Sequence, residues 1–184
     1  MGAIMSSKKA LFVLLLLLIV AGFIFFFFTS TRHDMLGPPP EVGQRAPDFE
    51  FPDLTGRMVR LSDLRGKTVF LNIWATWCPP CVQEMPLIER LHRAMHGRSF
   101  IVLAASQDTG ADSDEKVRKL TRGFGLTFTS LLDPQRQLTF LYRVSGYPET
   151  FIIDKEGILI QRIIGPREWT SPEWMGALTQ LAER

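Results

Sequence analysis

Residues 68–81 read Thr-Val-Phe-Leu-Asn-Ile-Trp-Ala-Thr-Trp-Cys-Pro-Pro-Cys, and this stretch decides the fold. Its first seven residues form a mostly apolar run that is too short for a helix, which predicts a buried central strand. The strand leads directly to Cys78 and Cys81, which are the only two cysteines of the chain. Apolar residues at helical spacing then predict a helix over 81–96, with Gly97 as its stop. The cysteines are therefore expected where a strand ends and a helix begins.

Apolar runs and periodic segments alternate outward from this centre. Further strands are expected at 99–105 and 128–132, helices at 113–124, 134–142 and 172–181, and β-hairpins at 49–61 and 150–164. Strands that alternate with helices and then finish in a hairpin and a helix predict an α/β sandwich with a mixed sheet.

The chain begins with an apolar segment that is separate from this domain. Residues 10–28 are uncharged and almost all Leu, Val, Ile or Phe, and as a helix they would span about 28 Å, close to the hydrocarbon thickness of a bilayer. A cleaved signal peptide is the alternative, but its apolar region is usually shorter, and no Ala-x-Ala site follows this one. Lys8 and Lys9 precede the span, whereas the charges just beyond it nearly cancel, so the positive-inside rule keeps residues 1–9 in the cytoplasm.

The expected organisation is a cytoplasmic N-terminus at 1–9, one transmembrane anchor at 10–28, a linker at 29–42 and a single domain at 43–184. Prolines in the linker indicate a stiff spacer. This topology places the domain on the outer, periplasmic or extracytoplasmic, side of the cytoplasmic membrane, with the anchor in the lipid bilayer. The net charge of +2 is too small to indicate nucleic acid as a partner.

The spacing of the two cysteines favours redox chemistry over a structural role. A disulfide between residues three positions apart closes so short a loop that it constrains little of the unfolded chain. At a helix N-terminus, free N–H groups and the positive end of the dipole stabilise a thiolate, which is the nucleophile in disulfide exchange. Cys78 is the expected exposed attacker and Cys81, one turn inside the helix, is the expected resolving thiol. Pro79 and Pro80 would occupy the first helical positions, where prolines are tolerated.

A metal site is the competing interpretation of the same residues. Together with His92 and His96, the two cysteines have a spacing that superficially resembles a zinc-finger ligand set. Because the helix begins at the cysteines, His92 would lie about 16 Å along its axis from Cys81. One ion with bonds of about 2 Å cannot join them. We therefore expect no metal site, with both histidines on the outer face of the helix.

Two segments resemble a known family. Trp74-Ala-Thr-Trp-Cys-Pro-Pro-Cys81 resembles the thioredoxin active-site signature, and Pro86 matches the proline in that family's first active-site helix. Val144-Ser-Gly-Tyr-Pro-Glu-Thr-Phe-Ile-Ile-Asp154 resembles the cis-proline segment of the membrane-tethered TlpA/ResA/DsbE (CcmG)-like branch. The resemblance implies that Pro148 is cis and packed against the cysteines.

The N-terminal part of the domain resembles the extension of the same branch. The matching segments are Ala46-Pro-Asp-Phe49 and Leu61-Ser-Asp-Leu-Arg-Gly-Lys67. The similarity covers residues 43–183, with several spaced motifs in the same order. It implies a thioredoxin-like three-layer sandwich with a mixed central sheet and an N-terminal β-hairpin extension.

The sequence departs from ordinary thioredoxin at Asn72, where that family usually has a buried Asp that assists proton transfer. Two carboxyls could replace it: Glu84 matches the acidic position of ResA-like proteins, and Glu149 matches the Pro-Glu-Thr of DsbE-like ones. A carboxylate near the thiols raises their pKa and can accept or return a proton during exchange. The alternative for each is a solvated surface charge.

Three residues near the cysteines are expected to contact substrate. Trp77 and Pro79 flank Cys78, and Tyr147 would present its backbone to a bound peptide in strand-like pairing. Trp74 could either contact a partner or pack in the core.

The resemblance implies a thiol-disulfide oxidoreductase that reduces protein disulfides and needs no cofactor beyond the Cys78–Cys81 pair. Its substrates would be segments such as the Cys-x-x-Cys-His of apocytochrome c, in cytochrome c maturation, with electrons from a membrane thiol carrier of the DsbD/CcdA type. A redox or copper-handling chaperone in oxidase assembly is the alternative, although its relatives use a longer Cys spacing and a distant His. A general oxidant or a peroxidase is the third hypothesis.

Overall fold

The computed structural model describes residues 13–23 and 40–184. Residues 13–23 are helical, and within the described residues no helix is both long and apolar enough to cross a membrane. The ends of the predicted anchor at 10–28, the predicted N-terminus at 1–9 and most of the predicted linker lie outside the described residues.

Five strands form the central sheet in the order β5-β4-β3-β6-β7. The parallel strands are β3 (Thr68–Trp74), β4 (Phe100–Ser106) and β5 (Thr129–Leu132), and the antiparallel ones are β6 (Glu149–Ile153) and β7 (Leu159–Ile164). Every residue of β3 is buried, as expected for a central strand that is covered on both faces. The mixed sheet and the central position of residues 68–74 are confirmed.

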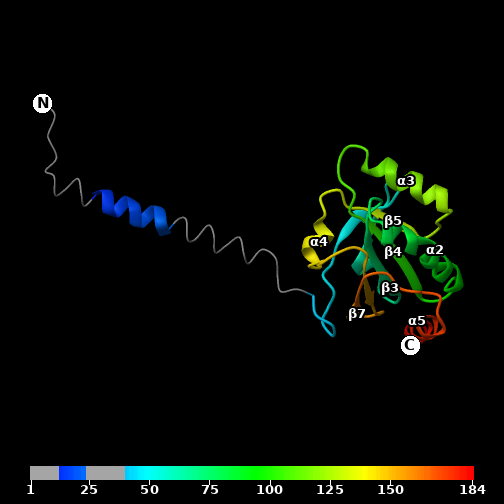
Figure 1. Ribbon diagram of the computed structural model, residues 1–184. Coiled ribbons are helices and arrows are strands. Elements are labelled where there is room, and N and C mark those ends of the chain that lie inside the picture. Colours follow the sequence, from blue (N-terminus) through cyan, green and yellow to red (C-terminus); the bar gives the residue numbers. More distant parts are fainter. Residues whose placement is uncertain (1–12, 24–39) are drawn as a thin grey trace, which may run out of the picture. The chain divides into compact units, whose positions relative to one another are not determined.

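Helices cover both faces of this sheet and complete the three layers (Figure 1). They are α2 (Pro79–Ala94), α3 (Ser113–Phe124), α4 (Gln137–Leu141) and α5 (Pro172–Glu183). Side chains of α2, α3 and α5 pack in one core cluster with Phe70 and Trp74, whereas α4 packs in a second cluster with Leu71 and Ile73. Because successive residues of a strand point to opposite faces, these two clusters lie on opposite sides of β3.

Two helices begin at residues other than the predicted ones. Helix α2 begins at Pro79, because Cys78 itself is the N-cap. Helix α4 begins at Gln137 instead of residue 134, because Arg136 has a left-handed backbone with φ of 56°. The carboxylate of Asp133 accepts hydrogen bonds from the first backbone N–H groups of α4 and thereby sets its start.

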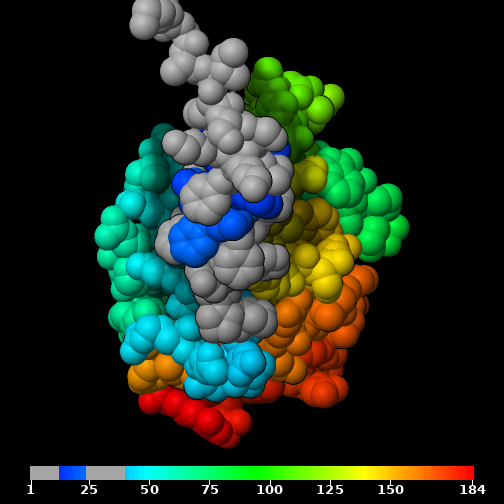
Figure 2. All heavy atoms as spheres, turned by 90° about the vertical axis from the view of Figure 1, so that its left-hand side faces the viewer, coloured from blue at the N-terminus to red at the C-terminus, as the bar shows by residue number. Residues whose placement is uncertain are grey.

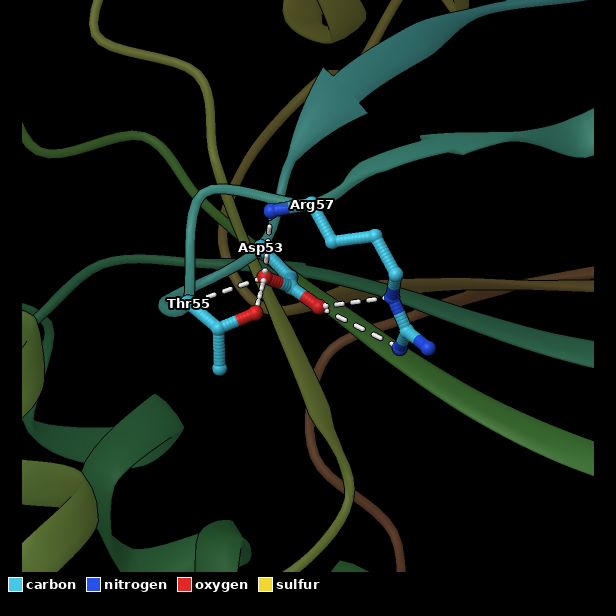
Figure 3. A network of polar contacts seen from close by, with 3 residues as sticks. All are labelled: Asp53, Thr55 and Arg57. Carbon is cyan, nitrogen blue, oxygen red and sulfur yellow. Dashed lines mark hydrogen bonds and ion pairs between the residues drawn. The ribbon is translucent and has the colours of Figure 1, made fainter.

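The predicted N-terminal hairpin consists of β1 (Glu50–Pro52) and β2 (Met58–Arg60), followed by the 3₁₀ turn η1 (Leu61–Leu64). A buried carboxylate closes it (Figure 3): Asp53 Oδ1 accepts hydrogen bonds from the backbone N–H and hydroxyl of Thr55 and from the backbone N–H of Arg57. The Arg57 guanidinium lies 3.2 Å from Oδ2. Burial alone would raise the pKa of Asp53, but these hydrogen bonds hold it below the usual value.

The segment before the hairpin is hydrogen-bonded to the start of the edge strand β7. Residues 43–46 exchange backbone hydrogen bonds with residues 157–159, and Figure 2 shows these cyan and orange segments side by side. The hydroxyl of Tyr142 donates a 2.7 Å hydrogen bond to the carbonyl of Pro47. The ring of Tyr142 is fully buried between those of Phe49 and Phe151. This tyrosine therefore ties the extension to the second core cluster.

Replacement of Tyr142 by Phe should lower the free energy of unfolding by about 1 kcal/mol, because the carbonyl of Pro47 loses a buried partner. Replacement by Leu should cost about 2–3 kcal/mol, because the ring contacts are also lost. Urea unfolding of the full chain measures both values. Equal stability of wild type and Tyr142→Phe would show that packing alone fastens the extension.

Candidate active site

The two cysteines form a disulfide at the N-terminus of α2, with their Cα atoms 5.3 Å apart. The Sγ of Cys78 accepts a 3.3 Å hydrogen bond from the backbone N–H of Cys81. Pro79 and Pro80 occupy the first helical positions and have no N–H, so the first free N–H of the helix points at this sulfur. The same contact favours negative charge on Cys78 once the disulfide is reduced.

The expected difference in accessibility between the two cysteines is present, but it is small. Cys78 is 5% exposed and Cys81 is completely buried. The prediction of an exposed Cys78 is therefore wrong for the disulfide form, in which Cys78 packs in the first core cluster with Trp74 and Ala75. A partner can reach only a small part of Cys78, and it cannot reach Cys81 at all.

Glu84 lies one helical turn beyond Cys81 and is 1% exposed. Its Oε1 accepts hydrogen bonds from the indole N–H of Trp169 and from the backbone N–H of Arg167, whereas Oε2 has no partner among the described residues. Burial raises the pKa of Glu84 to about 7, against the opposing effect of these two hydrogen bonds. A carboxyl that titrates near neutral pH can both give and take a proton under physiological conditions. The surface-charge alternative for Glu84 is thereby excluded.

Glu149 has a different environment. It is fully buried and forms an ion pair with Arg162, while its Oε2 accepts hydrogen bonds from the backbone N–H and hydroxyl of Ser145. Arg162 also donates to the carbonyl of Arg143, 2.8 Å away. In the β3–β6 register Glu149 is opposite Ile73, which belongs to the second core cluster. Glu149 thus braces the loop at 143–145 from the α4 side of the sheet, whereas Glu84 belongs to the helix that carries the cysteines.

Asn72 occupies the interior position at which the thioredoxin resemblance implied an acid. It is fully buried on β3, and its amide donates a 3.0 Å hydrogen bond to the hydroxyl of Thr150. An amide holds no titratable proton at neutral pH, so Asn72 organises this part of the core without exchanging protons.

Two of the predicted substrate contacts, Trp77 and Tyr147, lie against each other. The peptide bond before Pro148 is cis, and Pro148 is buried. Trp77 is 56% exposed, Pro79 is exposed, and the ring centroid of Tyr147 lies 5.7 Å from that of Trp77. Trp74 is completely buried, so of its two predicted roles it packs in the core and does not contact a partner.

The histidines do not approach the cysteines. His96 is exposed as predicted, but His92 is half-buried, and its ring lies edge-on to Phe128 at 6.2 Å. Within residues 13–23 and 40–184 there is no group of three or more His, Cys, Asp or Glu side chains that could hold a metal ion.

Sequence reasoning missed the residues that support the site from a distance. Trp169, fully buried near the C-terminal helix, holds Glu84, although 85 positions separate them. Gln107 and Arg136, which follow β4 and β5, meet beside Trp77. Neither belongs to a local motif, so only the strand order could have indicated that they come together.

Comparison with known proteins agrees with this site. Residues 42–162 match the AhpC/TSA family. The chain is 35% identical over 141 residues to the thiol-disulfide oxidoreductase ResA of Bacillus thuringiensis (strain Al Hakam), an alignment that covers 77% of this chain and 79% of the relative. It is 44% identical over 124 residues to ResA of Geobacillus kaustophilus (strain HTA426), covering 67% and 70%.

A solved structure supports the same assignment. The crystal structure of a protein provisionally named thiol:disulfide interchange protein DsbE, from Chlorobium tepidum, superposes with a TM-score of 0.66 at 34% sequence identity. The superposition covers 77% of this chain and 95% of that one. The thioredoxin-like fold is therefore confirmed. The chain belongs to the AhpC/TSA family as a thiol-disulfide oxidoreductase of the ResA type, with the Cys78–Cys81 disulfide as its redox group.

Proposed function

We propose that this oxidoreductase reduces protein disulfides, in particular the Cys-x-x-Cys-His segments of apocytochrome c, during cytochrome c maturation on the outer face of the cytoplasmic membrane. The observation that carries the reductive direction is the pairing of an N-capping Cys78 with the buried Glu84 on one helix. Such a pair can supply both the nucleophile and the proton that disulfide reduction needs. The apocytochrome substrate is supported by the resemblance to the TlpA/ResA/DsbE-like branch.

The proposed reaction consumes the reduced pair. The Cys78 thiolate attacks one sulfur of the substrate disulfide, so that a mixed disulfide forms and the second substrate sulfur leaves as a thiolate. Cys81 then loses its proton and attacks the Sγ of Cys78, which releases the first substrate sulfur. The substrate gains two electrons from the pair, one proton from Cys81 and one proton from solvent, and the chain returns to the disulfide form. Glu84 can accept the Cys81 proton and pass it on to a departing sulfur.

The remaining partners follow from the proposed location. Residues 10–28 would anchor the chain in the lipid bilayer, with the domain on the outer side. Because each turnover leaves the pair oxidised, a membrane thiol carrier of the DsbD/CcdA type would supply the two electrons that reduce it again. Anchoring keeps the domain close to such a carrier and to substrates that emerge at the membrane.

Replacement of Cys81 by Ser should trap the substrate, because Cys78 still attacks and no thiol resolves the mixed disulfide. Non-reducing electrophoresis of cells that express the full chain should show an adduct that mass spectrometry identifies as an apocytochrome c. Cys78→Ser is the matched control and should give no adduct, since the remaining thiol is buried. Adducts that contain only other proteins would contradict the apocytochrome substrate.

The direction of electron flow is tested by the reduction potential of the pair in the full chain. A reductase should lie well below the roughly −120 mV of a strong oxidant such as DsbA. A value near that of DsbA would contradict the reductive direction while leaving disulfide exchange itself intact.

Glu84→Gln should remove a pH dependence from both stability and rate. In the wild type, the folded protein keeps a proton on Glu84 that the unfolded chain loses above about pH 4.5, so stability falls as the pH rises towards 7. The Gln variant should lack this fall and should be more stable at pH 8 by up to about 3 kcal/mol, since one pKa unit corresponds to about 1.4 kcal/mol. Its rate of disulfide exchange should lose the inflection near pH 7. Urea unfolding and stopped-flow kinetics across pH 4–9 measure both effects.

Glu89→Gln is the matched control on the same helix. Burial would raise the pKa of Glu89, but hydrogen bonds from Thr127 and Arg93 hold it below the usual value. Its charge therefore stabilises the fold above the unfolded pKa, and that stabilisation is lost as the pH falls through the folded pKa. The control should be destabilised at neutral pH and should keep the rate inflection. Loss of the inflection in both variants would show that Glu84 is not its source.

A further inference from the structure

Arg136 lies over the ring of Trp77 and has no carboxylate partner among the described residues. The guanidinium carbon of Arg136 lies 5.9 Å from the ring centroid of Trp77, the residue that precedes Cys78. We propose that Arg136 is a specificity-determining residue that binds a carboxylate side chain of the substrate, so that preferred protein disulfides carry Asp or Glu near the attacked cysteine. This inference rests on the proposed reduction of protein disulfides and adds the class of substrate.

The position of Arg136 is fixed by its backbone and its side chain together. Its backbone has φ of 56°, which is uncommon for a residue with a Cβ atom, and its N–H donates to the carbonyl of Asp133 at 2.9 Å. Its Nε donates a 3.2 Å hydrogen bond to the carbonyl of Gln107. These contacts hold the guanidinium over Trp77 and leave its two terminal nitrogens available, because Nε alone is used.

A buried network connects this arginine to the residue before the cis-proline. The fully buried side chain of Gln107 donates to Asp133 at 3.1 Å and accepts from the hydroxyl of Thr139 at 2.8 Å. The Thr139 hydroxyl also lies 2.7 Å from the hydroxyl of Tyr147. Gln107 thus connects the two residues: its backbone carbonyl binds Arg136, and its side chain binds Tyr147 through Thr139. Trp77 lies against both of them.

The charges around Arg136 leave it open to an anion. Among the described residues no carboxylate lies within ion-pairing distance of its guanidinium. The neighbouring acids have other partners: Asp133 accepts from Gln107 and from the first turn of α4, and Asp108 accepts from Thr76 and Ser106. A half-buried guanidinium with free donors matches the two oxygens of a carboxylate.

The geometry favours a polypeptide side chain as the source of that carboxylate. The exposed ring of Trp77 offers apolar surface next to the cation, and the ring of Tyr147 lies against it. Trp77 directly precedes Cys78 in the chain. A substrate segment that places its cysteine at Cys78 must pass these residues, so a side chain a few positions away comes within reach of Arg136. Burial of part of the ion pair against the rings would strengthen it relative to a fully solvated pair.

The test uses the reduced full chain and oxidised Cys-x-x-Cys peptides with blocked termini, so that side chains are the only carboxylates. Each peptide carries a single Glu at one of the three positions before or one of the three positions after the cysteine pair. Its matched partner carries Gln at the same position. Acid-quenched samples analysed by chromatography give the second-order rate constant. At about 50 mM salt, the Glu peptide should react about 5- to 10-fold faster than the Gln peptide for at least one position, and the ratio should shrink at high salt.

Variants assign the preference to Arg136. Arg136→Gln should bring the Glu-to-Gln ratio close to one, whereas Arg136→Lys should keep part of the preference. Arg90→Gln is the matched control, because it removes the same charge from an exposed position on α2, about 13 Å along the helix from Cys81. It should leave the ratio unchanged.

Two outcomes would overturn the inference. The first is a wild type that shows no Glu preference at any position, and the second is a preference that survives in Arg136→Gln. In both cases exchange with the Gln peptides would still proceed, so the proposed disulfide reduction would stand. A wild type that reduces neither kind of peptide would instead count against the proposed function.

Discussion

The rest of the site depends on one contact, in which the backbone N–H of Cys81 points at the sulfur of Cys78. This contact exists because β3 ends just before the cysteines and α2 begins at a proline, so that the first N–H groups of the helix are missing. The positive end of the helix is thereby directed at a single sulfur atom. It makes the two cysteines chemically unequal before any partner arrives, since only Cys78 receives this stabilisation and only Cys78 is accessible at all.

The buried acids show how one fold gives similar groups different properties. Glu84 and Glu89 share a helix, yet burial raises the pKa of the first, whereas hydrogen bonds from Thr127 and Arg93 lower that of the second. Glu84 is the more deeply buried of the two and leaves one oxygen without a partner among the described residues, whereas Glu89 also has the positive charge of Arg93 beside it. Glu149 has a counterion in Arg162 and braces a loop. A buried carboxyl therefore titrates near neutral pH only where hydrogen-bond donors and nearby cations do not offset the cost of burying its charge.

The spacing of apolar residues along the sequence was sufficient to predict most of the helices and strands. The partners of each site residue could be identified only from the tertiary structure. The strand at 68–74 and the helix after the cysteines are visible in the sequence because each is continuous and its apolar spacing is regular. The start of α4 was mispredicted, because the left-handed backbone of Arg136 belongs to a residue type that rarely adopts it. Glu84 and Glu149 looked equivalent in sequence. Their difference comes from Trp169 and Arg162, which lie far from them along the chain.

The groups that react and the groups proposed to recognise the substrate belong to different segments of the chain. The reacting sulfurs and Glu84 belong to α2, whereas Arg136 and Tyr147 are held by a network that starts from the ends of β4 and β5. The two sets meet at Trp77, which is exposed and carries no proton or electron in the reaction. A change in the second set can therefore alter which disulfide docks without altering the helix N-terminus that activates Cys78. Because Cys78 is almost covered, docking decides which disulfides react, and recognition here acts on the rate of attack more than on the potential of the pair.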